Sequence, residues 1–89
     1  MKIKTVHTRQ YIDLIDYLIK LRKETSINQK NMAIALNLNQ TDISKIESRE
    51  RRIDISETFK WLHKCKPYDK KIILEAYNIF IETLHDERI

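Results

Sequence analysis

The side chains best suited to chemistry in this sequence lie between Ile27 and Arg52, and they are hydrogen-bonding groups rather than catalytic ones. Gln40 and Thr41 open a short segment with helical spacing, and arginines follow it. A glutamine amide both donates and accepts, so it can pair with the groove edge of adenine, while threonine offers a hydroxyl group and a methyl group that suits thymine. A short helix with this polar tip beside a cationic loop suits insertion into the major groove of DNA.

Further polar and basic residues around this tip suit phosphate oxygens. Contacts to phosphate fix the register of a protein on DNA without reading its sequence. The expected phosphate contacts are Asn28, Lys30, Ser44, Ser48, Arg49, Arg51 and Arg52. The alternative is that all of these are ordinary solvated side chains on a surface helix, and the surrounding pattern favours binding.

The charge of the chain fits a nucleic-acid partner. The net charge is +4, with the excess of basic residues before Pro67 and a net acidic segment after it. A basic body of this kind is typical of phosphate binding. A basic domain without a DNA partner would show the same net charge, so the charge alone does not decide.

The residue types that enzymes and metal sites need are scarce or scattered. His7, His63 and His85 are dispersed, and the single Cys65 permits neither an internal disulfide nor a multi-cysteine zinc site. With no glycine, a glycine-rich phosphate loop is excluded. We therefore predict no enzyme activity, cofactor or metal, and we interpret Cys65 as a half-buried apolar residue.

The length and the N-terminal segment bound the class of protein. Eighty-nine residues make one domain with a single modest core. The opening MKIKTVHT lacks the apolar core of a signal peptide, and no run is long enough to cross a bilayer. The sequence predicts a cytoplasmic protein with no membrane partner.

Apolar residues recur at helical spacing, so the sequence predicts an all-α protein. The expected architecture is a compact five-helix bundle with a helix-turn-helix and a long C-terminal helix. Capping residues mark the starts of the helices. The expected helices run from after Thr8 to about Glu24, from Asn28 to Leu36, from Asn39, from Asp54, and from about Asp69 to His85. Residues 1–8 form a tail, 9–66 the DNA-binding domain, and 67–89 the C-terminal helix.

The same spacing predicts which side chains face the core. A left-handed backbone is expected at Asn37. The outward residues of the third helix are expected to be Gln40, Thr41, Ser44 and Lys45. The expected inward residues are Tyr11, Leu14, Ile15, Leu18, Leu21, Met32, Ala33, Leu36, Ile43, Ile46, Phe59 and Leu62, with Trp61 as a further candidate.

Roughly three-fifths of the chain, from Leu14 to Lys66, resembles the Cro and phage-repressor type of helix-turn-helix domain, the XRE family. That family folds as a compact five-helix bundle whose third helix reads the major groove. Asn37 and Arg49 stand where glycine is usual, and Ile53 where proline is usual. The matching features are Gln29 opening the second helix, Met32-Ala33, Leu36-x-Leu38, Ile43-Ser44-x-Ile46-Glu47, and Arg51-Arg52.

This resemblance implies roles for individual residues. Gln40, Thr41 and Lys45 match residues that touch base edges of double-stranded DNA. Gln29 matches one that braces the first of these and contacts the phosphate backbone. An ion pair between Arg22 and Glu47 is implied as a structural tie between the reading helix and the first helix.

The C-terminal helix has more apolar surface than one side of a small bundle needs. It either packs as core or meets its copy in a homodimer through Ile73, Tyr77, Phe80 and Leu84. A two-fold dimer would place two reading helices about 34 Å apart on a palindromic site.

Three functions follow from these patterns. The favoured one is a sequence-specific transcriptional regulator, a repressor acting as a homodimer on a palindromic operator. The alternative is an antitoxin whose C-terminal helix binds a partner toxin and which autoregulates its operon. A purely protein-binding module is least favoured, because it leaves the polar tip and the arginines unexplained.

Overall fold

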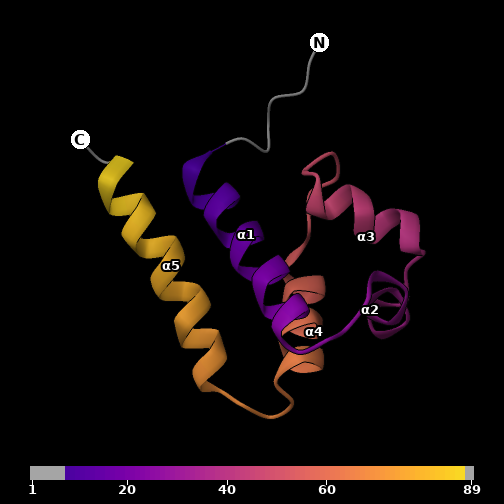
Figure 1. The fold of residues 1–89 in the computed structure, drawn as a ribbon. Helices are drawn as coiled ribbons and strands as arrows, with labels where there is room; N and C mark the ends of the chain where they lie inside the picture. Colours follow the sequence, from indigo (N-terminus) through magenta and orange to yellow (C-terminus); the bar gives the residue numbers. More distant parts are fainter. Residues whose placement is uncertain (1–7, 88–89) are drawn as a thin grey trace.

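The predicted all-α architecture is confirmed. The computed structural model describes the backbone of residues 8–87 and the side chains of residues 8–81. This part contains no strand and five helices: α1 (Arg9–Glu24), α2 (Gln29–Leu36), α3 (Gln40–Glu47), α4 (Ile55–Cys65) and α5 (Lys71–Glu87). In Figure 1, α1 lies between α5 on one side and α2 and α3 on the other. Within the described residues, no helix has the length and apolar character needed to cross a membrane.

Polar caps fix where the helices begin. The Thr8 hydroxyl accepts from the Tyr11 N–H at 3.3 Å, and the Asn28 side chain accepts from the Asn31 N–H at 2.8 Å. Asp54 accepts from the Glu57 N–H at 2.7 Å at the start of α4. These starts agree with the sequence. Only α5 differs, beginning two residues later than expected.

A residue with a left-handed backbone conformation follows each of the first three helices, although the chain contains no glycine. Ser26, Asn37 and Arg49 have φ angles of 60°, 60° and 66°. After α3, the Arg49 N–H donates to the Ile46 carbonyl at 3.0 Å and the Glu50 N–H donates to the Lys45 carbonyl at 2.8 Å. This is the helix ending that glycine usually supplies. Arg49 therefore keeps the loop geometry, at a cost of about 1–2 kcal/mol for a side chain in this region.

The core lies where α1, α2, α3 and α4 meet. Trp61 has no exposed surface, and its indole N–H donates to the Leu18 carbonyl of α1 at 3.0 Å. Cys65 is buried, and burial raises the pKa of its thiol. Leu14 is only partly buried. The buried apolar residues are Tyr11, Ile15, Leu18, Leu21, Met32, Ala33, Leu36, Ile43, Ile46, Ile53, Trp61, Leu62, Cys65, Ile72 and Ala76.

The expectation that Phe59 faces the core is wrong. Its side chain is 48 % exposed, whereas Trp61 and Leu62 are buried. The buried positions of α4 also include Thr58 and Cys65, so one helical stripe faces inward. Phe59 lies outside that stripe, one turn after the exposed Ile55.

The α5 helix divides its apolar residues between two surroundings. Ile72 and Ala76 are buried, while Ile73 and Tyr77 are exposed. The Tyr17 hydroxyl of α1 donates to Glu75 at 2.8 Å, and burial together with this hydrogen bond raises the pKa of Tyr17. One stripe of α5 thus packs as core, and a second stripe remains outside. Phe80 is half-buried, and the side chain of Leu84 lies outside the described residues.

Replacing the central tryptophan should test this packing. Trp61→Ala is expected to reduce the free energy of unfolding by about 3–5 kcal/mol, because it removes a fully buried aromatic side chain. Ile34→Ala is the control, since Ile34 is 70 % exposed and its loss should change stability by about 0.5 kcal/mol or less. Urea unfolding measures both. Equal losses in the two variants would contradict the assigned core.

Candidate nucleic-acid interface

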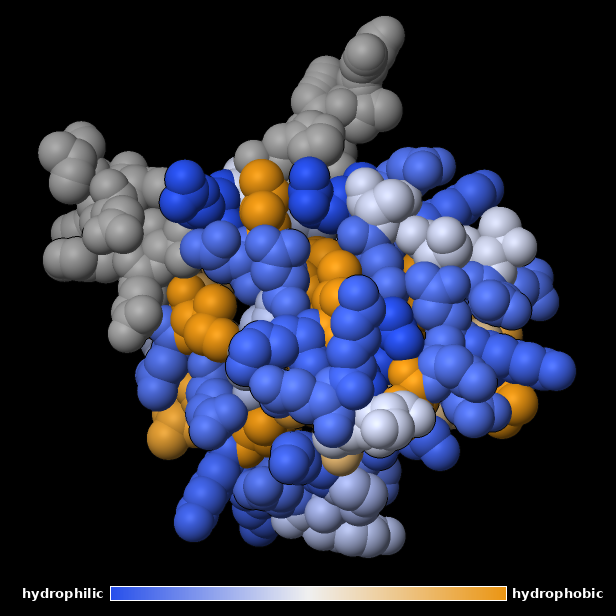
Figure 2. Space-filling view, in the orientation of Figure 1, coloured by the Kyte–Doolittle hydropathy of each residue, from blue (hydrophilic) through white to orange (hydrophobic). Residues whose placement is uncertain are grey.

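The α3 helix presents one polar side and buries the other. Ile43 and Ile46 have no exposed surface. The opposite side carries exposed residues, as the sequence predicted: Gln40, Thr41, Ser44 and Lys45. Figure 2 views a face that includes α3, and hydrophilic side chains cover most of it, with small separate hydrophobic patches.

The groups at the tip of α3 are open to a partner. Among the described side chains, those of Gln40, Thr41 and Lys45 make no hydrogen bond or ion pair. The Asn39 N–H donates to the Asp42 carboxylate at 3.1 Å, so Asp42 caps the start of the helix. The tip therefore offers an amide, a hydroxyl and an ammonium group on a fixed two-turn frame.

An ion pair ties the end of α3 to α1. Arg22 Nε lies 2.6 Å from Glu47 Oε2, and its Nη2 donates to Oε1 at 3.1 Å. Arg22 Nη1 also donates to the Ile27 carbonyl at 2.7 Å. The side chains of Arg22 and Glu47 are only 9 % and 11 % exposed. The ion pair implied by the sequence resemblance is thus present. Both charged groups are nearly buried and make hydrogen bonds.

Gln29 takes part in the same tie. Its amide nitrogen donates to Glu47 Oε1 at 2.9 Å. No hydrogen bond joins Gln29 to Gln40 within the described side chains, although the resemblance implied that the first braces the second. In this structure Gln29 stabilises the carboxylate that holds α3.

The start of α2 supplies two of the expected phosphate contacts. The oxygen of the Asn28 side chain accepts from the Asn31 N–H as a helix cap. Lys30 is exposed, and no hydrogen bond or ion pair to another described residue involves its side chain. Of the two residues, Lys30 is therefore the one whose side chain is available to contact a phosphate group.

Arg51 has a structural partner, Glu57, that the sequence did not indicate. Its guanidinium donates to both oxygens of Glu57, at 3.1 and 2.9 Å. This contact lowers the pKa of Glu57, which also accepts from the Asp54 N–H at 3.0 Å. The spacing of Glu57 from Asp54 is visible in the sequence, whereas the path of the loop that brings Arg51 to Glu57 is not. Arg51 fastens the loop to α4 while remaining 33 % exposed.

Tyr11 positions the rest of this loop. Its hydroxyl accepts from the Ile53 N–H at 3.0 Å, and the Arg52 guanidinium lies 5.1 Å from the centre of its ring. The sequence placed Tyr11 in the core, but it gave no sign of either contact. Ile53 in place of proline supplies the N–H that makes the first one.

Ser48 and Arg49, the remaining expected phosphate contacts after α3, differ in whether their polar atoms already have partners. The Ser48 hydroxyl lies within hydrogen-bond distance of the Lys45 carbonyl, at 3.2 Å, and of Glu50, at 3.0 Å. It is thus already satisfied inside the turn. Arg49 is half-buried, and its Nε has no hydrogen-bond partner among the described residues.

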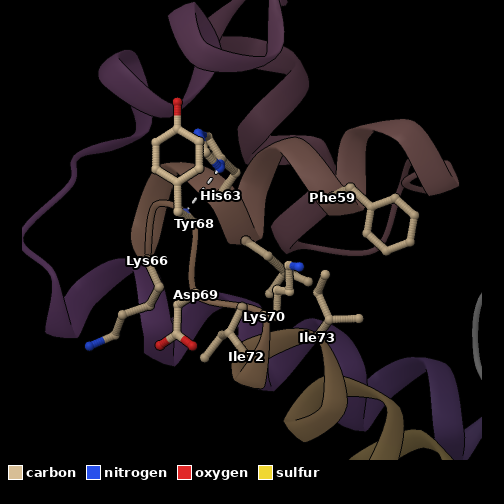
Figure 3. A pocket seen from close by; sticks show the side chains of 9 residues that line it. Phe59, His63, Lys66, Tyr68, Asp69, Lys70, Ile72 and Ile73 are labelled. Atoms are coloured by element: carbon tan, nitrogen blue, oxygen red, sulfur yellow. Dashed lines mark hydrogen bonds between the residues drawn. The ribbon is translucent and has the colours of Figure 1, made fainter.

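His63, in α4, contacts the residues that follow this helix. Its Nδ1 accepts from the Tyr68 N–H at 3.4 Å, and the two rings meet edge to face at 4.7 Å. Figure 3 shows His63 facing Tyr68 beside a hollow of about 200 Å³, with Phe59 of α4 and Ile73 of α5 at its other side. The described residues contain no cluster of three or more histidine, cysteine or acidic side chains suited to a metal ion.

The chain was compared with protein-family models and with curated proteins, and neither comparison gave a match.

Breaking the ion pair should be costly. Glu47→Ala leaves Arg22 buried without its main partner, and we expect a loss of about 3–5 kcal/mol in the free energy of unfolding. The control is Glu24→Ala, which breaks the exposed Lys20–Glu24 pair and should leave the free energy of unfolding nearly unchanged. The double variant Arg22→Met/Glu47→Leu should recover part of the loss. Urea unfolding that gives similar small losses for Glu47→Ala and Glu24→Ala would refute the buried tie.

Acid should weaken the attachment of the loop to α4. Because the folded pKa of Glu57 is lowered, its contribution is present above its ordinary value of 4.5 and is lost as pH falls through the lowered pKa. Both Glu57→Gln and Arg51→Gln should flatten this part of the stability profile. Thermal unfolding measured at a series of pH values checks it, and an unchanged acid limb in Glu57→Gln would count against the contact.

Proposed function

We propose that this protein is a sequence-specific DNA-binding transcriptional regulator of the Cro and phage-repressor type, acting as a repressor. In this proposal a homodimer reads a palindromic operator with α3 in the major groove. The observation that carries it is the exposure of Gln40, Thr41 and Lys45 together on a helix whose other side is buried. Such a protein acts in the cytoplasm, by binding and not by catalysis.

The side chains at the tip of α3 have the chemistry of base readout. A glutamine can pair bidentately with adenine, a lysine with guanine O6 and N7, and the threonine methyl can contact thymine. Each good bidentate pair discriminates by about 1–3 kcal/mol. Because α3 is held by its buried isoleucines and by Glu47, the backbone that carries these groups is already in place before binding.

Basic groups on both flanks of α3 suit the phosphate backbone. Lys30 stands at the start of α2, and the loop after α3 carries Arg49 and Arg52. Arg51 keeps part of its surface exposed beside its Glu57 contact. These groups would set the register of α3 in the groove.

Dimerisation fits the size of the module. One helix-turn-helix unit contacts few base pairs, and two copies on a two-fold axis double the site. The exposed Ile73 and Tyr77 on α5 support a partner surface away from α3.

A second candidate function is an antitoxin, which the same apolar face favours. The side chains of Ile73, Leu74 and Tyr77 are 44–59 % exposed along α5 and could enter the groove of a partner toxin. Co-purification with a small protein encoded next to this one, and a monomer without it, would support this candidate. A self-contained dimer would speak for the repressor.

Selection from a pool of random duplexes tests the proposal. Sequencing of the bound fraction should yield an inverted repeat whose half-sites lie about 34 Å apart, one turn of DNA. A pool that stays unenriched after repeated rounds would refute sequence-specific binding.

Two exposed residues should separate base reading from phosphate binding. Gln40→Ala should lose about 1–3 kcal/mol on the selected site and relax preference at one base pair in each half-site. Lys30→Gln should weaken binding to every duplex and reduce the slope of log K against log salt by about 1. Fluorescence anisotropy on matched and altered duplexes measures both, and uniform loss in both variants would exclude direct reading by Gln40.

A further inference from the structure

An apolar furrow separates α4 from α5. Among its helix contacts, α5 packs most extensively on α1 and least on α4, which leaves a hollow of about 310 Å³ between the two. Leu14, Leu62 and Ala76 line its inner part. Side chains of α4 and α5 form its two rims: Ile55 and Phe59 on one side, Ile73 and Tyr77 on the other.

The rims expose most of the apolar surface that one side of an interface needs. Ile55, Phe59, Ile73 and Tyr77 are 68, 48, 44 and 57 % exposed. Large apolar and aromatic side chains have areas near 200 Å², so these four together expose roughly 400 Å². A standard interface buries about 800 Å² per partner, of which somewhat more than half is apolar. The rims supply most of that apolar share.

The furrow is large enough to receive a side chain from the rim of a second copy. A cavity of about 150 Å³ already accommodates a benzene ring, so this hollow can receive an aromatic side chain. Phe59 and Tyr77 stand on its rims. In a two-fold interface the same patch meets itself, so a rim that fits a hollow on the same surface is self-complementary.

We propose that a second copy of this chain fills the furrow, packed about a two-fold axis, with aromatic rim residues of each copy entering the hollow of the other. This inference rests on the proposed homodimer. It assigns the contact to α4 and α5 together, whereas the sequence assigned it to α5 alone.

The placement of the furrow leaves the reading helix free. In the described chain α3 and α5 make no contact and lie on opposite sides of α1 (Figure 1). The interface helix α4 also carries Glu57, which holds Arg51 of the loop after α3. The α4 helix thus connects the contact with the second copy to the arginine-containing loop after α3. In a dimer, the two-fold axis therefore sets the relative positions of the two copies of this loop.

Sedimentation equilibrium on the full chain tests the furrow. The test variants are Ile55→Glu and Tyr77→Glu, and the matched control is Ile34→Glu, whose isoleucine on α2 is 70 % exposed and does not line the furrow. Wild type and control should have twice the single-chain mass of 10.8 kDa. Each furrow variant should self-associate at least about thirtyfold more weakly, as expected for a central interface residue. Circular dichroism should show all variants equally helical.

Several results would overturn the proposal. These are a single-chain mass for wild type at every concentration, furrow variants that remain dimeric, an equal loss in the control, or a different protein found bound in the furrow. The affinity of the same variants for DNA is measured separately. The furrow variants should keep their affinity for one half-site and lose the added affinity for the inverted repeat. If the protein forms a dimer that depends on the furrow but selects no duplex, the DNA-binding proposal is refuted and the proposed interface is supported.

Discussion

The buried ion pair between Arg22 and Glu47 is the interaction on which the proposed interface depends. The α3 helix has eight residues, and a helix this short is not stable alone in water. Its position comes from Ile43 and Ile46 in the core and from the Glu47 carboxylate at its end, which accepts from Arg22 and Gln29. Because these contacts all lie on one side, the other side of α3 is free to present polar groups.

Much of the fold could be predicted because its signals are local. The caps at Thr8, Asn28 and Asp54 and the helical spacing of apolar residues placed four helix starts correctly. The polar side of α3 was predicted for the same reason. The inward side of α4 could not be fixed, since aromatics at positions 59 and 61 point in different directions. The space beside the Leu18 carbonyl favours Trp61, and that space exists only in the folded chain.

The contacts of the loop after α3 were also beyond the sequence. Arg51 with Glu57, and Tyr11 with Ile53 and Arg52, depend on how the loop crosses α1 and α4. Together they fix the path of the arginine-rich loop: Arg51 holds it to α4, and Arg52 lies over the ring of Tyr11. The two proposed contact surfaces thus differ in chemistry and place, with polar groups around α3 and an apolar furrow between α4 and α5.

The most direct test of DNA reading by α3 is a titration of the ¹⁵N-labelled protein with the selected duplex, followed by amide and side-chain NMR shifts. If α3 enters the major groove, the largest changes occur at the Gln40 side-chain amide and at the backbone of residues 28–31, 39–45 and 48–52, while residues of the α4–α5 furrow keep the shifts of the free protein. Changes centred on the furrow, with Gln40 and Lys45 unaffected, would contradict it.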